Sequence, residues 1–155
     1  MIKLEQILVP TDFSEFSSTA LKYGCELASR FGARLHLLHV VEDNFAFVPD
    51  GGLVVGAELI VETKQAAEKA IERLPDADWL PNGRDQVQRS VVQGTPFVEV
   101  VRYAKSNEID LIVVGSHGRT GLSHMLLGSV AELVVRKAPC PVLTVRPGQH
   151  EFVMP

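Results

Sequence analysis

The sequence predicts an α/β fold: one doubly wound domain with a five-stranded parallel sheet and helices on both faces. Short, nearly continuous apolar runs alternate with segments in which apolar residues recur every three or four positions. This alternation gives the order β-α-β-α-β-α-β-α-β, and strands that are apolar throughout are typical of a parallel sheet covered on both faces. A length of 155 residues, 46% hydrophobic and 22% charged, suits a single domain.

The first third of the chain is predicted to fold as a strand, a helix and a second strand. The run Ile7-Leu8-Val9 makes Gln6 to Pro10 a buried strand that ends in a polar loop. From Ser14 to Phe31, small and apolar residues recur on one helical face, and Gly32 ends that helix. Leu35 to Val41 is a second continuous apolar run and hence a second buried strand.

The middle of the chain is predicted to contain a long loop, a helix and a half-exposed strand. Glu42 to Gly56 is rich in Asp, Asn, Pro and Gly, which are loop residues. Helical spacing of apolar residues runs from Ala57 to Leu74, and Pro75 stops this helix. Polar and apolar residues alternate from Gln86 to Val92, as expected for a strand near a sheet edge.

The last third of the chain is predicted to contain two helices, each followed by a strand. Thr95-Pro96 opens the first of these helices, because proline is tolerated in the first turn. Leu111 to Val114 is the most apolar strand of the chain. A helix from about Gly128 to Lys137 follows, and Pro141 to Val145 is the last strand.

Charge and hydropathy exclude several classes of function. Fifteen Lys and Arg against nineteen Asp and Glu give a net charge of -4 and a pI near 5.7, so no basic surface is expected for nucleic acid. No stretch approaches the roughly 18 to 20 apolar residues of a membrane span, and the first segment meets Pro10 too soon for a signal-peptide core. We expect a cytoplasmic protein that binds neither nucleic acid nor membrane, with one domain over residues 1–146 and a flexible tail over residues 147–155. Cys25 and Cys140 are the two cysteines, which are expected to be reduced and buried rather than part of a disulfide framework or a zinc site.

A glycine-rich segment after the fourth predicted strand is the strongest candidate for a binding site. Ligands of doubly wound sheets lie outside the carboxyl ends of the strands. The glycines from Gly115 to Gly121 permit close backbone approach, and Gly128-Ser129 opens a helix whose first N–H groups favour an anion such as phosphate. Ser129 can add a hydroxyl donor, and Arg119 or His117 a positive charge. The alternative is that the glycines only turn the chain and that Ser129 only caps the helix.

Several common nucleotide and hydrolase motifs are absent from the sequence. There is no GxxxxGK[ST], which excludes a P-loop nucleotide hydrolase, and no GxGxxG after the first strand, where a dinucleotide-binding fold needs it. A GxSxG elbow is also missing, and the residues after the third strand offer no acceptor Asp for a receiver domain. The glycines follow the fourth strand instead, which indicates a different nucleotide geometry.

Four residues have the spacing G-x2-G-x9-G-[ST]: Gly115, Gly118, Gly128 and Ser129. This spacing resembles the ATP-binding motif of the universal stress protein family. Four further blocks look like the same family, namely residues 7–14, 37–41, 110–115 and 138–145. The likeness covers residues 3 to 146, which is nearly the whole chain.

This resemblance implies a Rossmann-like sheet of order 3-2-1-4-5 with ATP at the carboxyl ends of its first and fourth strands. By the same likeness, Asp12 would meet the ribose or the adenine, Val40 or Val41 would meet the base through its backbone, and Gly115 would lie against the ribose. Mg²⁺ would arrive on the nucleotide. From its place before the first helix alone, Asp12 is instead a cap that accepts N–H bonds.

The phosphates would sit on Gly118, Gly128 and Ser129, with a further backbone N–H from Val130. The resemblance and the glycine segment together give this set of candidate nucleotide-binding residues: Pro10, Thr11, Asp12, Val40, Val41, Gly115, Ser116, His117, Gly118, Arg119, Gly128, Ser129 and Val130.

The expected function is that of an ATP-binding stress-response sensor or regulatory module with little or no turnover. Between Gly115 and Val130 there is no Lys, Asp or Glu, so the segment lacks groups that efficient phosphoryl transfer requires. Two alternatives stay open: a slow ATPase or other nucleotide-hydrolysing enzyme on the same fold, and a dimeric interaction module in which the nucleotide is only structural. AMP or cyclic AMP is an alternative ligand.

No catalytic residue and no metal site of the protein's own is expected. His36 and His39 are three residues apart on a strand and point to opposite faces. His117 and His124 have no partner at ligand spacing. The last strand, Pro141 to Val145, is predicted to be an apolar edge strand that needs a cover, and the resemblance implies that it pairs with its copy in a homodimer.

Overall fold

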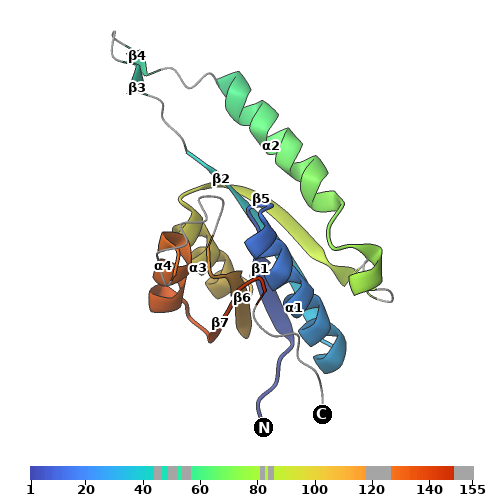
Figure 1. Ribbon diagram of the computed structural model, residues 1–155. Coiled ribbons are helices and arrows are strands. Elements are labelled where there is room, and N and C mark those ends of the chain that lie inside the picture. Colours follow the sequence, from blue (N-terminus) through green and yellow to red (C-terminus); the bar gives the residue numbers. More distant parts are fainter. Residues whose placement is uncertain are drawn as a thin grey trace.

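Five parallel strands form the central sheet of this protein (Figure 1). The computed structural model describes residues 1–43, 47–48, 52–53, 57–80, 83, 86–117 and 127–148. The strands of the sheet are β1 (Gln6–Pro10), β2 (Arg34–Glu42), β5 (Gln88–Gly94), β6 (Leu111–Gly115) and β7 (Val142–Val145). Their order is β5-β2-β1-β6-β7, which is 3-2-1-4-5 when the strands of this sheet are counted along the chain. The predicted fold class and strand order are confirmed.

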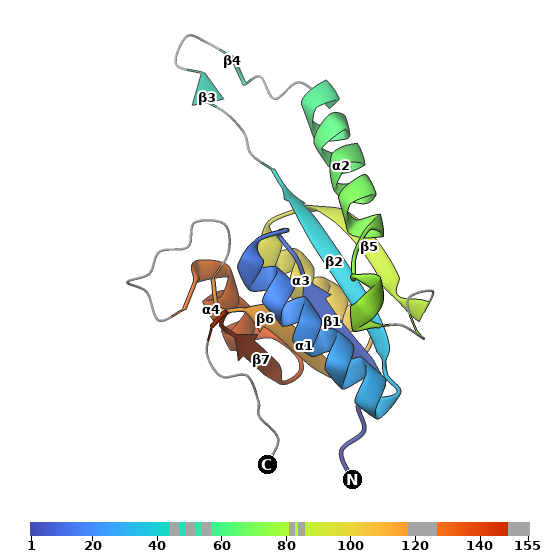
Figure 2. The same cartoon turned by 45° about the vertical axis from the view of Figure 1, so that its right-hand side comes forward.

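Two helices cover each face of the sheet. The helices are α1 (Glu15–Phe31), α2 (Ala57–Glu72), α3 (Pro96–Ser106) and α4 (Ser129–Lys137). α1 and α2 lie on one face, and α3 and α4 lie on the other (Figures 1 and 2). The central strand β1 serves both layers, because Ile7 and Val9 pack beneath α1 whereas Leu8 packs beneath α3 and α4. Within the described ranges, no helix is long and apolar enough to cross a membrane.

Strand register places the carboxyl ends of β1, β2 and β6 side by side. Pro10 lies opposite Leu38, and Leu8 lies opposite Ile112. The N–H of Thr11 extends the first pairing by donating to the carbonyl oxygen of Leu38 at 2.8 Å. Since β1 is bordered by β2 on one side and by β6 on the other, the strand order reverses here, and this is where doubly wound sheets hold ligands.

Local sequence signals set the ends of α1 and β5. Ser14 caps α1 by accepting an N–H of the first turn on its side chain, and Gly32 closes the helix with a φ of 66°. β5 begins at Gln88, two residues later than the alternation predicts. The reason is that the N–H of Gln86 donates to the carbonyl oxygen of Gly83 in a turn, at 2.9 Å.

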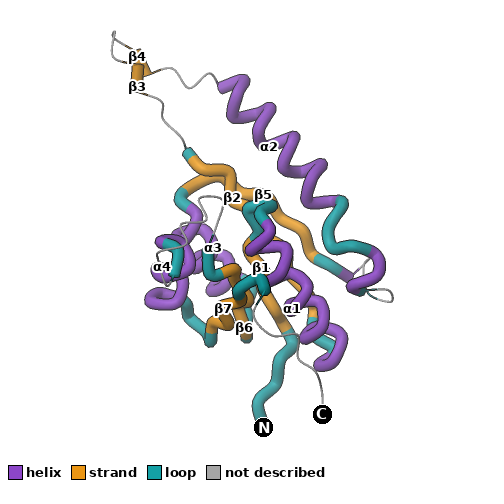
Figure 3. The backbone as a smooth tube through the Cα atoms, viewed as in Figure 1, coloured by secondary structure: helices purple, strands orange, loops and turns teal. Residues whose placement is uncertain are grey.

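The predicted loop between β2 and α2 contains one short hairpin. β3 (Phe47–Val48) and β4 (Gly52–Leu53) pair antiparallel and lie apart from the main sheet, beyond the end of β2 (Figure 3). The 3-10 turn η1 (Ala77–Trp79) follows α2, and Trp79 packs against the core beneath α1. The tail predicted over residues 147–155 is described as far as Gly148, and its remainder lies outside the described residues.

The strand β7 lies at an edge of the sheet, as predicted. In the described part of the chain it pairs with β6 alone. The side chain of Leu143 keeps 38% of its surface exposed, and Thr144 is also exposed. An open strand edge with an exposed apolar side chain favours association with another strand.

The two cysteines are free thiols in different surroundings. Cys25 of α1 is fully buried in the core, as predicted, whereas Cys140, just before β7, is only half-buried. The prediction of two buried thiols is therefore correct for Cys25 alone. Burial raises the pKa of the Cys25 thiol to about 12.

Candidate functional site

Most of the predicted site residues lie together at the carboxyl edge of the sheet. β1 ends at Pro10 and is followed by Thr11 and Asp12, Val40 and Val41 lie near the end of β2, and β6 ends at Gly115 and is followed by Ser116 and His117. The first turn of α4 supplies Gly128, Ser129 and Val130 to the same edge, since Gly128 bonds directly to the residue after β6. Gly118 and Arg119 lie outside the described residues.

The turn that follows β1 is held by a set of local hydrogen bonds. The side-chain hydroxyl of Thr11, which is 6% exposed, lies 3.1 Å from the hydroxyl of Ser17 and accepts the N–H of Phe13, also at 3.1 Å. Phe13 has a φ of 63°, a left-handed conformation that residues with a Cβ rarely adopt. The turn therefore has one defined shape, fixed by Thr11 from within.

Asp12 lies in this turn and is not the cap of α1. Ser14 caps the helix, whereas Asp12 accepts the N–H of Ser14 on Oδ1 at 3.0 Å. This bond is an Asx turn within the loop. The reading of Asp12 as a helix cap is therefore wrong, and its half-buried carboxylate stands before the helix begins.

His39 of β2 supports the same turn from the side. Its Nδ1 lies 2.7 Å from the carbonyl oxygen of Thr11, and because a carbonyl only accepts, Nδ1 carries the proton. The imidazole ring also packs on the ring of Phe13, with centroids 4.5 Å apart and planes 31° apart. The expectation that His36 and His39 face opposite sides is met, since His36 contacts Tyr103 of α3. The sequence analysis did not include His39 among the site residues. Its position near the carboxyl end of a predicted strand could have indicated that it lies at the site.

β2 continues past the end of β1 and leaves backbone groups near this edge. Leu38 directs its carbonyl towards β1 by accepting the N–H of Thr11. Backbone groups of alternate residues point to the same side of a strand, so those of Val40 also face β1, whereas those of Val41 face β5. Val41 is 6% exposed and Val40 is half-buried against the core beneath α3.

The end of β6 lies against the first turn of α1. A Cβ added to Gly115 would lie 2.8 Å from the carbonyl carbon and oxygen of Phe16, and these backbone atoms have little room to move. The glycine at this position is therefore required by helix packing, independently of any ligand. The ring of Phe16 also lies near that of His117, with centroids 5.4 Å apart.

Ser116 links β6, β7 and α4. It is 1% exposed, and its N–H donates to the carbonyl oxygen of Val145 at 2.8 Å. Its carbonyl accepts the N–H of Gly128 at 2.6 Å, and its hydroxyl lies 3.1 Å from Nδ1 of His117. The bond to Gly128 brings the start of α4 to the end of β6, although eleven residues of the chain lie between Ser116 and Gly128.

The start of α4 has no side-chain cap. Gly128 occupies the cap position with an extended backbone, φ of −69° and ψ of 154°, and, being a glycine, it has no side chain to accept an N–H of the first turn. Ser129 is the first helical residue and is exposed, so the reading of Ser129 as a mere cap is wrong. The first N–H groups of a helix have no acceptors within the helix and carry the positive end of its dipole. An anion placed here is well accommodated.

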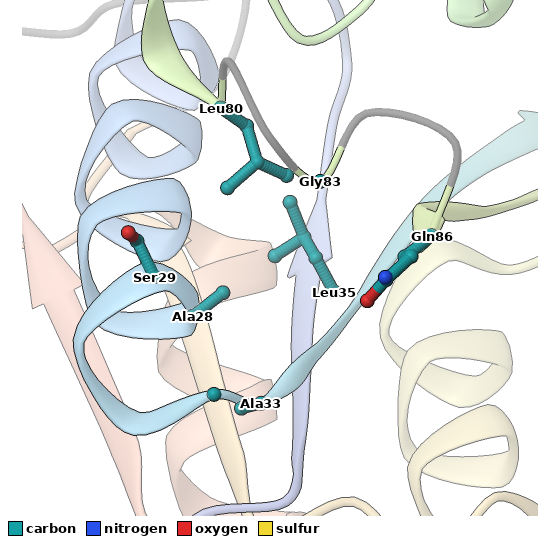
Figure 4. Close-up of a pocket in the computed structure, with 8 residues that line it drawn as sticks. Ala28, Ser29, Ala33, Leu35, Leu80, Gly83 and Gln86 are labelled. Atoms are coloured by element: carbon teal, nitrogen blue, oxygen red, sulfur yellow. The ribbon is translucent and has the colours of Figure 1, made fainter.

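A hollow of about 220 Å³ lies at the opposite end of the sheet (Figure 4). Leu35 and Leu80 point towards one another across it, and Gln86 reaches it from the turn that precedes β5. It lies at the amino-terminal ends of β2 and β5, away from the edge where the predicted residues gather. Among the described residues, no group of three or more His, Cys, Asp and Glu is placed to hold a metal ion.

Comparison with known proteins gives matches over nearly the whole chain. Residues 3–146 match the model of the universal stress protein family. The chain is 35% identical to universal stress protein MJ0531 of Methanocaldococcus jannaschii, over 95% of this chain and 85% of that protein. The solved structure of universal stress protein UspA from Lactobacillus plantarum is 28% identical, with a TM-score of 0.79 over 93% of this chain and 99% of that one. A universal stress protein solved in complex with cAMP is 26% identical, with a TM-score of 0.66 over 93% and 98% of the two chains.

Proposed function

This chain belongs to the universal stress protein family, and from that premise we propose that it binds an adenine nucleotide, ATP, at the carboxyl edge of its sheet. The proposed role is that of a stress-response sensor or regulatory module in the cytoplasm, with little or no turnover. The observation that carries the proposal is the hydrogen bond from Gly128 to Ser116, which sets the uncapped start of α4 beside the end of β6.

The phosphates are proposed to bind at the start of α4. An anion there accepts the first N–H groups of the helix and meets the positive end of its dipole. The exposed hydroxyl of Ser129 adds a donor, and Val130 adds a backbone N–H. The acidic residue in the first turn, Glu132, lies two positions after Val130, so the phosphate groups need to approach from the side of Gly128. Mg²⁺ is proposed to arrive on the nucleotide.

The nucleoside is proposed to lie between the ends of β1 and β2. The Asp12 carboxylate is an acceptor for the hydroxyls of a ribose. The backbone of Val40, which faces the β1 side beyond the last strand residue Pro10, offers donor and acceptor groups for the edge of a base. The solved relative in complex with cAMP supports an adenine nucleotide as the ligand class.

Low turnover is proposed from the groups that are missing in the sequence. Efficient phosphoryl transfer needs a positioned base and a group that stabilises the developing charge on the phosphate. The sixteen positions from Gly115 to Val130 contain neither Lys nor Asp nor Glu. A slow ATPase and a purely structural nucleotide are therefore outcomes that the experiment has to separate from a sensor.

The first experiment identifies the nucleotide that freshly purified protein releases on denaturation, by chromatography and mass. Calorimetric titration of nucleotide-free protein with Mg-ATP, ADP, AMP and cAMP then ranks the ligands. Released ATP, or tightest binding of ATP, supports the proposal. ADP that accumulates from bound ATP indicates the slow ATPase, and tightest binding of AMP or cAMP replaces ATP as the ligand. An empty protein that gives no heat with any of the four overturns nucleotide binding and leaves the interaction module.

Asp12→Ala tests the nucleoside end of the site. We expect ATP affinity to fall at least tenfold, about 1.4 kcal/mol, with the fold retained because Ser14 caps α1. Asp76→Ala is the matched control, since Asp76 is an exposed acid at η1 whose side chain makes no cap bond. Equal affinity of the Asp12 variant and the control would remove Asp12 from the site.

We also propose that β7 pairs with its copy in a homodimer. The support is its open edge, with Leu143 exposed and no second neighbour in the described part of the sheet. Leu143→Glu is expected to give monomers in sedimentation, and Leu59→Glu, which alters another exposed leucine, on α2, is expected to leave the assembly unchanged. A wild-type protein that sediments as a monomer at micromolar concentration contradicts the dimer.

A further inference from the structure

Two buried histidines lie on the strand β2, and only one of them touches the candidate site. His36 is 2% exposed and bonds through Nε2 to Gln6 and through Nδ1 to Tyr103, at 2.7 and 3.0 Å. His39 is 6% exposed and contacts the turn after β1. The first therefore serves the amino-terminal end of the sheet, and the second serves the carboxyl edge.

His39 holds the turn at two points that flank Asp12. Its Nδ1–H donates to the carbonyl of Thr11, the residue before Asp12, at 2.7 Å. Its ring packs on Phe13, the residue after Asp12, with centroids 4.5 Å apart. The backbone on both sides of the Asp12 carboxylate is therefore fixed by one side chain of the neighbouring strand.

Each of the two contacts of His39 offsets a cost within the turn: the strained backbone of Phe13 and the buried carbonyl of Thr11. Phe13 has a φ of 63°, which its Cβ disfavours, so the surroundings must hold it there. The ring contact with His39 is one such restraint, and the bond from the Phe13 N–H to the Thr11 hydroxyl is another. Without His39, the Thr11 carbonyl would also lose a buried donor.

We propose that His39 is a positioning residue for nucleotide binding: it aims the Asp12 carboxylate by clamping Thr11 and Phe13. This rests on the proposed function, because it assigns His39 a role in the same site. His39 acts through the turn and does not itself touch the nucleotide. Preorganisation of this kind raises affinity because the turn need not be ordered when the ligand binds.

Two substitutions separate the two contacts. His39→Phe keeps an aromatic ring against Phe13 but removes the donor to Thr11, whereas His39→Asn keeps an amide N–H close to the place of Nδ1 but removes the ring. The expected result is a fall in ATP affinity of about tenfold for each, measured by calorimetry at a temperature where melting curves show the variant to be folded. The milder His39→Asn keeps the test available if the phenylalanine variant does not fold.

The matched controls are His36→Phe and His36→Asn. These change an equally buried histidine of the same strand, at the end of the sheet remote from Asp12. We expect them to lower the melting temperature as the His39 variants do and to leave ATP affinity within twofold of wild type. A general effect of core disruption would instead weaken binding in all four variants.

A double-mutant cycle distinguishes positioning from a merely structural role. If His39 acts by aiming Asp12, then His39→Phe added to Asp12→Ala should weaken ATP binding by less than twofold beyond Asp12→Ala alone. His36→Phe added to Asp12→Ala serves as the control pair.

The outcomes of the cycle separate this inference from the proposed function. Suppose that the wild-type protein binds ATP. The inference is then overturned if the His39 variants bind ATP as tightly as wild type, or if the affinity loss of His39→Phe simply multiplies with that of Asp12→Ala. In either case the proposed function stands. Wild-type protein that binds none of the four nucleotides overturns both.

Discussion

Gly24 of α1 lies directly over Val9 of β1, so closely that a Cβ on Gly24 would lie 2.5 Å from Cγ2 of Val9. Both residues are buried, and Val9 belongs to the central strand. A glycine in the middle of a helix normally weakens it. Here the missing side chain lets the helix approach the sheet, and this approach sets the position of the turn from Thr11 to Ser14 that precedes α1.

Gly24→Ala is expected to destabilise the protein. Alanine improves helix propensity by about 1 kcal/mol, but overpacking against a fixed, branched side chain costs about 1 to 3 kcal/mol. We expect a net loss of about 1 kcal/mol in the free energy of unfolding, measured in urea. In a Val9→Ala background the same substitution should be neutral or stabilising, because Cγ2 is gone. If Gly24→Ala instead raised the free energy of unfolding in the wild-type background, α1 would be able to move away from the sheet without loss of stability.

Gly115→Ala is expected to lower stability severely, by about 3 kcal/mol. The added Cβ would meet the backbone of Phe16, which cannot rotate away as a side chain can. Urea unfolding of the nucleotide-free protein measures this loss without any contribution from a ligand. An unchanged urea midpoint would mean that the backbone of the first turn of α1 can shift to accommodate the added Cβ without loss of stability.

Gly128→Val is expected to do the reverse and spare the fold while weakening nucleotide binding. The backbone of Gly128 is extended, a conformation that valine adopts readily, so we expect a stability loss of only about 1 kcal/mol from the poorer helix cap. The branched side chain would stand where phosphate approaches the start of α4, and ATP affinity should fall at least tenfold. Calorimetry on the folded variant measures it, and unchanged affinity would place the phosphates elsewhere.

His36 is expected to make stability depend on pH. Burial, with a further contribution from the charge of Arg34, lowers the pKa of His36 below its ordinary value of 6.5. As the pH is lowered through 6.5, His36 of the unfolded chain therefore takes up a proton, whereas His36 of the folded chain stays neutral. The free energy of unfolding falls as the pH is lowered through that value and is regained as the pH rises. Melting temperatures of wild type and His36→Asn, compared at pH 7.5 and 5.5, should show the smaller fall in the variant. Equal falls would indicate that the folded protein protonates His36 as readily as the unfolded chain.

The two thiols are expected to react in a fixed order. Burial raises the pKa of Cys25 to about 12, and burial followed by the charge of Asp110 raises that of Cys140. The thiolate is the reactive form, so iodoacetamide at pH 8 should modify half-buried Cys140 slowly and leave Cys25 intact until urea is added. Peptide mapping by mass measures both. Cys25 modified as fast as Cys140 in the native protein would mean that α1 opens readily.

Sequence patterns predicted the sheet because β1 and β6 contain unbroken apolar runs, which are stable between two helical layers, whereas the alternation in β5 indicates a strand near the sheet edge. They could not give the geometry of the site, which depends on contacts across strands. The bond from His39 to Thr11 requires the register between β2 and β1, and no periodicity contains it. Asp12 and Ser14 are equally good caps by residue type, and the choice between them follows from the left-handed backbone of Phe13.

The candidate site lies on the seam between β1 and β6, and these strands come from opposite halves of the chain. Along that seam Asp110 accepts the N–H of Gln6 across a sequence separation of 104 residues, at 2.9 Å. Such distant pairings form late, because a long loop must close before they are gained. During synthesis the residues of the turn at Asp12 are thus available early, but the hydrogen-bonded pair of Ser116 and Gly128 is not. A ligand held at this seam would therefore bind only the completed sheet and would slow its opening. Nucleotide occupancy would then indicate whether the whole chain has folded.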